Sequence, residues 1–422
     1  MGMKKKQKQQ AEAEKRIKTG KRPGERLTVM VMLFYGTAFL LLALRNAAWQ
    51  GYALALGVPA AIWGGTHILG RCFHIDTLLF SLTNFLCALG ILILYDTNPG
   101  LAYHQVVYYG VGLVGMVFCI YFMRAIRRIR GLGFVMIFLS VAFLTLPLLI
   151  GRETYGAKNW IYFHGISIQP SEFVKILLIL ILAWFMSRRQ FLPWFLCAGG
   201  CLLCLMLQKD LGTALLYYGV TLLLFFASTA NVPLTLLGLA GGGGAAVMGY
   251  RMFAHVKKRV AIWRNPWSDY ENAGYQIVQS LMALASGSLL GVGLGLGSPT
   301  TIPVYETDFI FSVICEQFGL IFGVCVLLIY VAIIWRGTTI AMASRHSYQG
   351  LAAMGATMMI GLQTFVIIGG VIKLIPLTGV TMPFVSSGGS SLVSSMCLTG
   401  LIQGVASLNE DDLEEDLKLT EM

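Results

Sequence analysis

Long apolar stretches recur along almost the whole of this 422-residue chain, and they limit its fold more than any other feature. Each is close to the roughly 20 residues that a helix needs to cross a bilayer. A β-barrel would show short alternating segments instead. The sequence therefore predicts an all-α polytopic membrane protein with about 12 spans. We place them at residues 28–46, 51–69, 77–95, 106–123, 134–150, 173–187, 194–208, 211–228, 232–250, 309–335, 350–372 and 388–406.

Charge is sparse and unevenly placed. Only 12% of the residues are charged, against about 25% in soluble domains. The first 26 residues hold ten Lys or Arg and three Glu, and the loop 124–133 holds four Arg, whereas 95–105 has none. Cytoplasmic flanks of membrane spans are enriched in Lys and Arg, so we expect the N-terminus in the cytoplasm. An even number of spans then returns the C-terminus to the same side.

A basic arm can also bind nucleic acid. The membrane flank explains this arm better, so we expect contact with anionic lipids and no nucleic-acid partner. The basic run 255–267 falls on the outer side, in a long loop where the charge rule has less force.

These patterns divide the chain into parts. Residues 1–27 form a basic cytoplasmic arm and 28–76 two N-terminal transmembrane helices. Ten further spans occupy 77–406, with a large extracellular loop at 251–308. Residues 407–422 are an acidic cytoplasmic tail that we expect to be disordered.

Two carboxylates, Glu306 and Asp308, stand just before an apolar stretch in the segment "VYETDFIF". Asp308, Ser312 and Glu316 then repeat at i, i+4 and i+8, which predicts one polar stripe down a helix face. A charge at the depth of Glu316 costs about 2.5–3.5 kcal/mol on insertion scales. We therefore expect these side chains to mark the floor and rim of an outward-facing, water-filled cavity.

Other acidic residues gather on the predicted outer side. Asp210 lies between two spans with almost no loop, and Glu172 begins another span. A carboxylate at a helix start also caps free N–H groups and favours the helix dipole, and for Glu172 that reading stays open. Cations lie on the same side, among them Lys158 and Lys373. A base together with cations suits a substrate with an acidic leaving group, although structural ion pairs explain single cations equally well.

Five segments with linked order and spacing point to a known family. They are "AKNWIYFHGISIQPSEFVK", "QKDLGTALL", "NPWSDYENAGYQIVQSLMALASGSLLGVGLGLG", "IPVYETDFIFSVICEQFG" and "LIPLTGVTMPFVSSGGSSL". Together they resemble the shape, elongation, division and sporulation (SEDS) proteins, the family of FtsW, RodA and SpoVE. The resemblance covers about residues 77–406 and implies a ten-helix core, to which this chain adds two N-terminal helices. Asn159 departs from the family, which usually has Arg before the Trp.

The resemblance implies a peptidoglycan glycosyltransferase in the bacterial cytoplasmic membrane. Its substrate would be lipid II, polymerised on the outer face into β-1,4 glycan strands, and its partner a class B penicillin-binding protein. The family's essential Asp falls on Asp308, the candidate general base for a single inverting displacement. Substrate-binding candidates are Lys158, Trp160, Gln169, Glu172, Gln208, Asp210, Glu306, Ser312, Glu316, Lys373, Ser386, Gly388, Gly389 and Ser390.

The departing diphosphate needs stabilisation. The candidates are Lys158, Lys373, the basic segment 257–264 or a divalent cation, Mg²⁺ or Mn²⁺. The sequence shows no dedicated metal site, but a cation held by few carboxylates and the substrate phosphates would leave little signature.

Two other functions stay open. A lipid II flippase would favour polar residues through the whole membrane depth, and this chain gathers them on the outer side. A non-catalytic scaffold would leave the Asp308 stripe without a task. The motifs are shared by the division, elongation and sporulation members, so the sequence indicates the family and not the subfamily.

Overall fold

The computed structural model describes residues 24–125, 132–154, 157–163, 166–272 and 274–421. Long helices dominate these residues, because a helix satisfies its own backbone hydrogen bonds within the hydrocarbon of a bilayer. They are α2 (Glu25–Asn46), α3 (Trp49–Phe73), α4 (Thr77–Thr97), α5 (Pro99–Ala125), α6 (Leu132–Ile150), α7 (Pro170–Ser187), α8 (Phe191–Leu207), α9 (Leu211–Thr229), α10 (Val232–Met252), α13 (Ile310–Ala343), α14 (Ser347–Val371) and α15 (Gly389–Glu421).

The predicted all-α polytopic fold is confirmed. Within the described residues, eleven helices are long and apolar enough to cross a membrane. The twelfth predicted span corresponds to α8, which is apolar but has 17 residues. Most of the predicted basic arm, residues 1–23, lies outside the described residues, as does the Arg-rich stretch 126–131.

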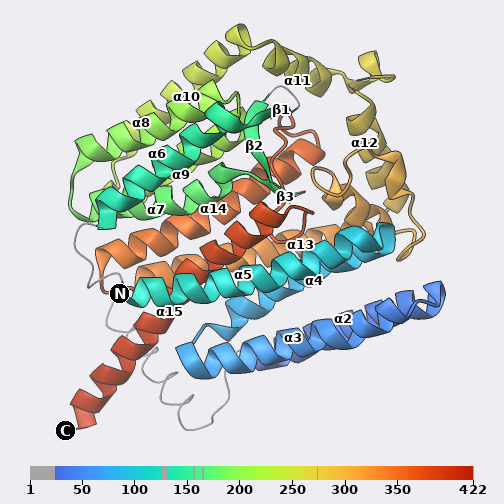
Figure 1. Cartoon of the computed structure of the whole chain (residues 1–422), viewed down its shortest axis with the longest axis horizontal. Helices are drawn as coiled ribbons and strands as arrows, with labels where there is room; N and C mark the ends of the chain where they lie inside the picture. Colours follow the sequence, from blue (N-terminus) through green and yellow to red (C-terminus); the bar gives the residue numbers. More distant parts are fainter. Residues whose placement is uncertain (1–23, 126–131, 155–156, 164–165, 273, 422) are drawn as a thin grey trace.

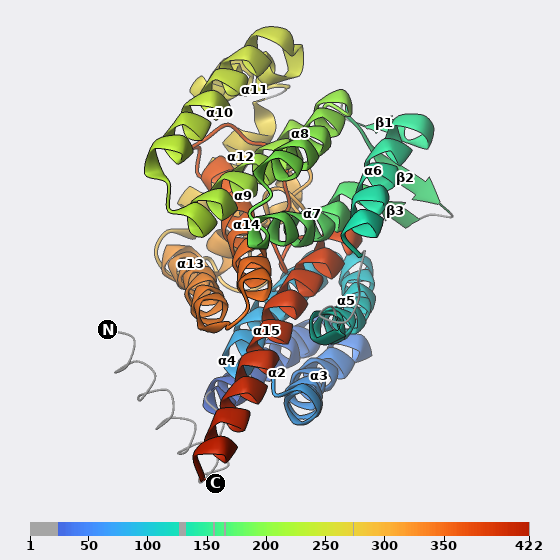
Figure 2. The ribbon, with the colours of Figure 1, turned by 90° about the vertical axis from the view of Figure 1, so that its left-hand side faces the viewer.

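The long helices pack side by side as one bundle (Figures 1 and 2). In α4, 89% of the most apolar window is buried, whereas none of the corresponding window in α10 is. A helix that is apolar all round suits a buried position. Close packing of α5 with α15 depends on small residues: a Cβ added at Gly112 or Gly400 would meet the facing helix at 2.9 or 2.6 Å. Such residues let membrane helices approach each other.

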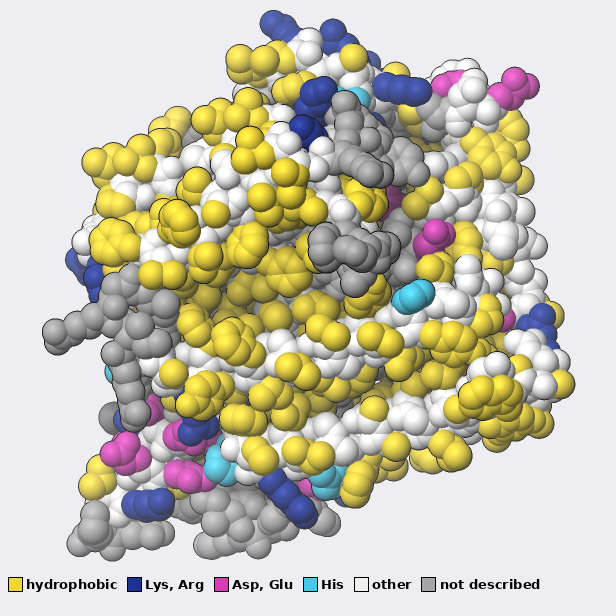
Figure 3. Space-filling view, viewed as in Figure 1, with side chains coloured by type: hydrophobic (Ala, Val, Ile, Leu, Met, Phe, Trp, Pro, Cys, Tyr) yellow, Lys and Arg dark blue, Asp and Glu magenta, His cyan; other side chains and the backbone are white. Residues whose placement is uncertain are grey.

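The outer surface is apolar where the bilayer would surround it. In Figure 3, hydrophobic side chains cover the middle of the visible face, and most Lys, Arg, Asp and Glu side chains lie toward its edges. The protein is therefore a multi-pass membrane protein in contact with lipids.

The two N-terminal helices form a hairpin packed on the rest of the bundle. Tyr35 on α2 donates a 2.7 Å hydrogen bond to the carbonyl of Phe85 on α4, and Phe34 stacks on Phe322 of α13. The predicted N-terminal spans thus correspond to α2 and α3.

One end of the bundle carries the long connections, and we call it the loop end. Between α6 and α7 lies a three-stranded antiparallel sheet of β1 (Arg152–Thr154), β2 (Ala157–Phe163) and β3 (Ile166–Ile168). The sequence analysis predicted no strand in this region. The predicted loop 251–308 is also folded locally, into α11 (Ala254–Arg264), η2 (Pro266–Asp269), α12 (Tyr275–Gly287) and η3 (Pro299–Thr301). In Figure 2 the sheet projects at one edge, opposite α10 and α11.

The prediction of a disordered acidic tail was wrong. Helix α15 continues to Glu421, beyond the end of the predicted last span. Asp411 forms a 2.8 Å ion pair with Arg124 of α5, and Arg345 pairs with Asp416. The tail is acidic, as the sequence showed, and basic side chains of α5 and of the α13–α14 connection pair with part of its charge.

Candidate active site

Asp308 lies at the loop end, just before the first residue of α13. Its backbone N–H donates to the carbonyl of Val304 at 3.3 Å, within a run of turns at residues 304–309 that we call the Asp308 segment. The segment is fastened to the turn before α15: the N–H of Ser387 donates to the carbonyl of Glu306 at 2.8 Å, and the Ser386 hydroxyl donates to that of Thr307. These hydrogen bonds thus hold together two segments that are nearly 80 residues apart in the sequence.

The predicted stripe of Asp308, Ser312 and Glu316 is divided in the structure. Asp308 precedes the helix, because α13 begins at Ile310. Ser312 is buried against α12, with its hydroxyl 2.7 Å from that of Ser280. Glu316 accepts a 3.2 Å hydrogen bond from the N–H of Ser298. The two helical members of the stripe therefore contact the folded loop.

A cation from α11 approaches the candidate base without forming a direct ion pair with it. Arg259 donates a 2.8 Å hydrogen bond to the carbonyl of Thr378. A Cβ built on Gly379, where φ is +76°, would lie 3.6 Å from Asp308 Oδ2 and 3.7 Å from Arg259 Nη2. The carboxylate and the guanidinium therefore converge over the same glycine, and their proximity gives the loop end a carboxylate and a cation in one place.

The surroundings of Asp308 raise its pKa and so favour its neutral form. Burial raises the pKa of Asp308 to about 6, while a hydrogen bond from Thr307 and the Arg259 guanidinium act in the opposite direction. The charge of Glu306 adds to the rise. A general base works best when its pKa lies near the operating pH, so Asp308 has the electrostatic character of one.

A second polar group joins the sheet to α7 and α9. Asp210 caps α9 by accepting from the N–H of Thr213 at 3.0 Å. Its other oxygen accepts from Asn159 at 2.7 Å and Gln169 at 3.1 Å. Asn159 therefore reaches the carboxylate although it stands where the family usually has Arg. These contacts connect three elements around Asp210.

Other predicted residues are directed at the backbone of α6 or lie on the sheet. Lys158 Nζ donates to the carbonyl of Leu148 at 2.8 Å, and Gln208 donates to that of Leu144. Trp160 is half-buried on β2.

The remaining candidates border the turn before α15 or the end of α11. Ser390 is buried, and Gly389 lies against the ring of Tyr108. Gly388 is half-buried beside Ser391. Lys373 Nζ lies 3.4 Å from the carbonyl of Arg264, so this cation is tied to α11.

The structure contains a buried ion pair that the sequence analysis did not predict. Lys175 on α7 is 2% exposed and pairs with Glu172 at 2.6 Å. Glu172 also accepts from Ser394 of α15, and Lys175 donates to Gln363 of α14 at 3.1 Å. A Lys three residues after Glu172, inside an apolar span, was the available signal, since such pairs share a helix face.

This buried network continues toward the Asp308 segment. Gln363 donates to the carbonyl of Thr381 at 2.9 Å, and the Thr381 hydroxyl lies 2.6 Å from that of Ser391. Ser386, which holds the Asp308 segment, lies between these two residues in sequence. The network therefore fixes both sides of the turn on which the segment rests.

The described residues contain no group of three or more His, Cys, Asp or Glu placed to hold a metal ion. Glu306 and Asp308 are the neighbouring carboxylates at the candidate site. Magnesium is often held by one or two carboxylates together with substrate phosphates, so this pair is compatible with a cation that arrives with a diphosphate.

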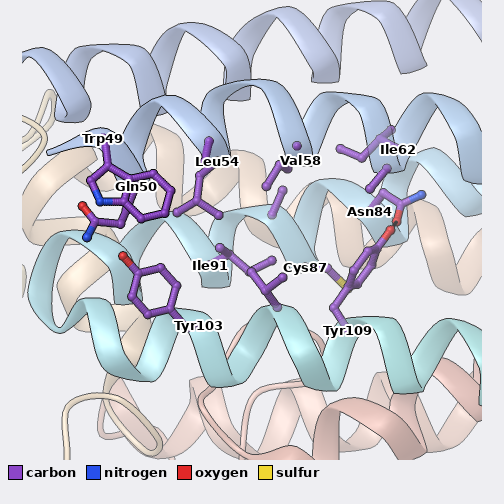
Figure 4. Close-up of a pocket in the computed structure, with 15 residues that line it drawn as sticks. Trp49, Gln50, Leu54, Val58, Ile62, Asn84, Cys87, Ile91, Tyr103 and Tyr109 are labelled. Atoms are coloured by element: carbon purple, nitrogen blue, oxygen red, sulfur yellow. Dashed lines mark hydrogen bonds between the residues drawn. The ribbon is translucent and has the colours of Figure 1, made fainter.

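A cavity of about 340 Å³ lies elsewhere, between α3, α4 and α5 (Figure 4). Its walls are almost entirely apolar, with Asn84 and Tyr109 joined by a 2.6 Å hydrogen bond. None of the candidate site residues lines it.

The fold and the site together define the class of this protein. It is a polytopic helical membrane protein whose candidate site is built around a carboxylate at the loop end. Residues 74–411 match the family FTSW_RODA_SPOVE, described as "cell cycle protein". The chain belongs to this family.

Known relatives agree with this assignment. Peptidoglycan glycosyltransferase RodA of Mycobacterium tuberculosis (strain ATCC 25618 / H37Rv) is 32% identical over 382 residues, covering 82% of this chain and 81% of that protein. Stage V sporulation protein E of Bacillus subtilis (strain 168) is 33% identical over 361 residues, covering 78% and 96%.

Solved structures share the fold. A chain from "Structural coordination of polymerization and crosslinking by a peptidoglycan synthase complex" aligns with a TM-score of 0.68 at 27% identity, over 79% of this chain and 98% of that one. The crystal structure of the rod shape determining protein RodA of Thermus thermophilus aligns with a TM-score of 0.60 at 27% identity, over 80% and 98%.

Proposed function

We propose that this protein polymerises lipid II into β-1,4 glycan strands at the outer face of the bacterial cytoplasmic membrane. Its curated relatives are peptidoglycan glycosyltransferases, and this chain is one as well. The observation that carries the finer proposal is the convergence of Asp308 and Arg259 over Gly379 at the loop end. In this proposal the loop end faces outward and both termini are cytoplasmic, in keeping with Arg124, Arg336 and Arg345 at the opposite end.

The mechanism is one in-line displacement with inversion. The sugar of lipid II is α-linked to its diphosphate and the polymer is β-linked, so a single displacement accounts for the stereochemistry. Asp308 accepts the proton of the acceptor 4-hydroxyl as that oxygen attacks the anomeric carbon. The bond to the diphosphate breaks, and the leaving group carries the negative charge away. Positioning of the two sugars contributes in addition to basicity.

Cations stabilise the leaving diphosphate. Arg259 is the first candidate, because it lies in the basic segment 257–264 and its guanidinium is at the same site as Asp308. Lys373 is a second, tied to the end of α11. A divalent cation, Mg²⁺ or Mn²⁺, would be held by Glu306 and the phosphate oxygens and would supply further charge neutralisation.

The proposed partner is a class B penicillin-binding protein, which crosslinks the strands and activates the polymerase. One structural neighbour comes from a peptidoglycan synthase complex, which supports a partner of this kind. Membrane lipids surround the apolar faces.

Polymerisation of lipid II by the purified protein together with its penicillin-binding partner tests the proposal. The partner's transpeptidase is blocked, so that glycan strands accumulate without crosslinks. We expect long glycan strands from the complex. An intact complex that makes no polymer would contradict the proposal, and transport of lipid II across vesicle membranes would then separate a flippase from a scaffold.

The rate of polymerisation should fall as the pH falls through about 6. The raised pKa of Asp308 means that the ionised base is lost there, whereas an ordinary Asp would stay ionised to about pH 4. Since Arg259 opposes the rise, Arg259→Gln should move the acidic limb to higher pH. The measurement is a pH–rate profile of both proteins.

The matched control is Lys258→Gln, which removes an exposed cation next to Arg259 in the same helix. Its acidic limb should coincide with that of the wild type. An unchanged limb in Arg259→Gln would show that the guanidinium does not act on the base.

A further inference from the structure

The hairpin α2–α3 precedes the residues that match the family, which begin at residue 74. We propose, resting on the proposed polymerase function, that this added hairpin positions the candidate base. It does so through Arg45, which holds the glycine-rich segment 287–297 against a break in α13. Arg45 touches neither substrate nor Asp308, and it is therefore a positioning residue.

Helix α13 is interrupted near its beginning. Gly319 has φ 85° and ψ 168°, which is not a helical conformation. A Cβ there would overlap the carbonyl oxygen of Leu289, so only glycine allows this approach. Asp308 lies two residues before the helical residues 310–318 that precede the break, so the direction of this helical part influences where the carboxylate stands.

The glycine-rich segment replaces the hydrogen bonds that α13 loses at the break. Val292 and Gly293 donate to the carbonyls of Glu316 and Gln317 at 2.9 and 3.0 Å. On the other side of the break, Leu320 donates to the carbonyl of Ser288 at 2.9 Å. Irregular backbone at membrane depth needs such partners within the protein. The segment is therefore what keeps the broken helix in one conformation.

Arg45, in the last turn of α2, fastens the far part of this segment. Its Nη1 lies 3.4 Å from the carbonyl oxygen of Leu294 and 3.9 Å from Asp96 Oδ1. Asp96, at the end of α4, also accepts a 2.7 Å hydrogen bond from Gln317. The guanidinium thus bridges the hairpin, the segment and, through Asp96, the break itself.

The packing at Gly295 shows how closely the segment is pressed on this ion pair. Gly295 has φ +74°, and a Cβ there would overlap Arg45 Nη1 and lie 2.6 Å from Asp96 Oδ1. The side chain of Asp96 is 9% exposed. Removing Arg45 leaves this buried carboxylate without its cation and the Leu294 carbonyl without its hydrogen-bond donor, so the segment holds the break in α13 less firmly.

The test compares Arg45→Ala, Arg45→Lys and Arg71→Ala. Arg71 is an exposed cation near the opposite end of the same hairpin, so its loss changes the charge equally without touching the segment. Amide hydrogen exchange is followed in peptides covering residues 288–298 and 315–321, and polymerisation rates are measured on the same preparations.

In Arg45→Ala we expect exchange of these peptides to quicken about tenfold, because local opening becomes easier. We expect kcat to fall about tenfold with KM little changed, since a misplaced base weakens the transition state and not substrate binding. Arg45→Lys should restore part of both, and Arg71→Ala should behave as the wild type.

Unchanged exchange in a folded Arg45→Ala protein would overturn the proposal, whatever its activity. If the wild type makes no polymer, hydrogen exchange still shows whether Arg45 holds the glycine-rich segment. Failure of the proposed function is thus distinguished from failure of this inference. If Arg45→Ala does not fold, Asp96→Asn, which weakens the same ion pair from its other side, takes its place with the same expected results.

Discussion

Replacing Asp308 by Asn should lower lipid II polymerisation about 10²–10⁴-fold, the usual contribution of a general base. The amide keeps the size of the side chain but cannot accept the proton from the attacking hydroxyl. The substitution also removes a half-buried charge whose ionisation is disfavoured at this site, so the fold should be at least as stable as before. Strand synthesis is measured by gel separation of the glycan products, beside thermal unfolding of the same samples.

The control for this experiment is Glu271→Gln, the same chemical change at an exposed carboxylate in the connection between α11 and α12. It should polymerise at the wild-type rate. If Asp308→Asn kept that rate as well, Asp308 would not be the base, and the mechanism would need another proton acceptor.

Replacing Lys175 by Met should destabilise the protein by about 3–5 kcal/mol, because it leaves a buried carboxylate without its partner. Lys175 is 2% exposed, and its ammonium contacts Glu172 and Gln363. Methionine fills a similar volume, so the loss reports the uncompensated charge of Glu172 and not a cavity. Thermal unfolding in one detergent gives the comparison.

The double variant Lys175→Met with Glu172→Gln distinguishes the ion pair from packing. It removes both charges, and we expect it to recover most of the lost stability. Lys258→Met, at an exposed position, should leave the unfolding temperature unchanged. A double variant as unstable as the single one would assign the effect to the shape of the Lys175 site.

Replacing Lys175 by Met should also lower the rate of polymerisation, but by a different mechanism from the replacement of Asp308. The network of Glu172 and Lys175 reaches Thr381, and the turn that follows holds the Asp308 segment through Ser386. A loosened turn would misplace the base without changing its pKa greatly. The acidic limb of the pH–rate profile should therefore stay near pH 6 while the rate falls.

Much of the fold was predictable because apolar length is a local property. A run of about 20 apolar residues has few alternatives to a membrane helix, and the predicted spans correspond to α2–α10 and α13–α15. The small sheet was harder to predict. The strand β2 carries "AKNWIYF", but its pairing partners are three residues each, too short for a periodic pattern.

The candidate site was predictable in composition and only partly in geometry. The sequence singled out Asp308 and placed it at a helix start, which the structure agrees with to within two residues. It also predicted one helical stripe, whereas the break at Gly319 and the turns of the Asp308 segment place Ser312 and Glu316 against α12 and its following segment. Regular periodicity assumes a continuous helix, and nothing local to α13 reveals that another segment supplies its missing hydrogen bonds.

The sequence by itself determined that the chain crosses the membrane many times, which family it resembles and which carboxylate to test. Those conclusions follow from apolar length and from motifs that are contiguous in the chain. Only the tertiary structure decided which cation approaches Asp308, that Lys175 reaches Gln363 of α14, and that Arg45 reaches Leu294. Such contacts join residues up to 249 positions apart, and they exist because helix packing, which depends on the whole chain at once, brings their side chains together.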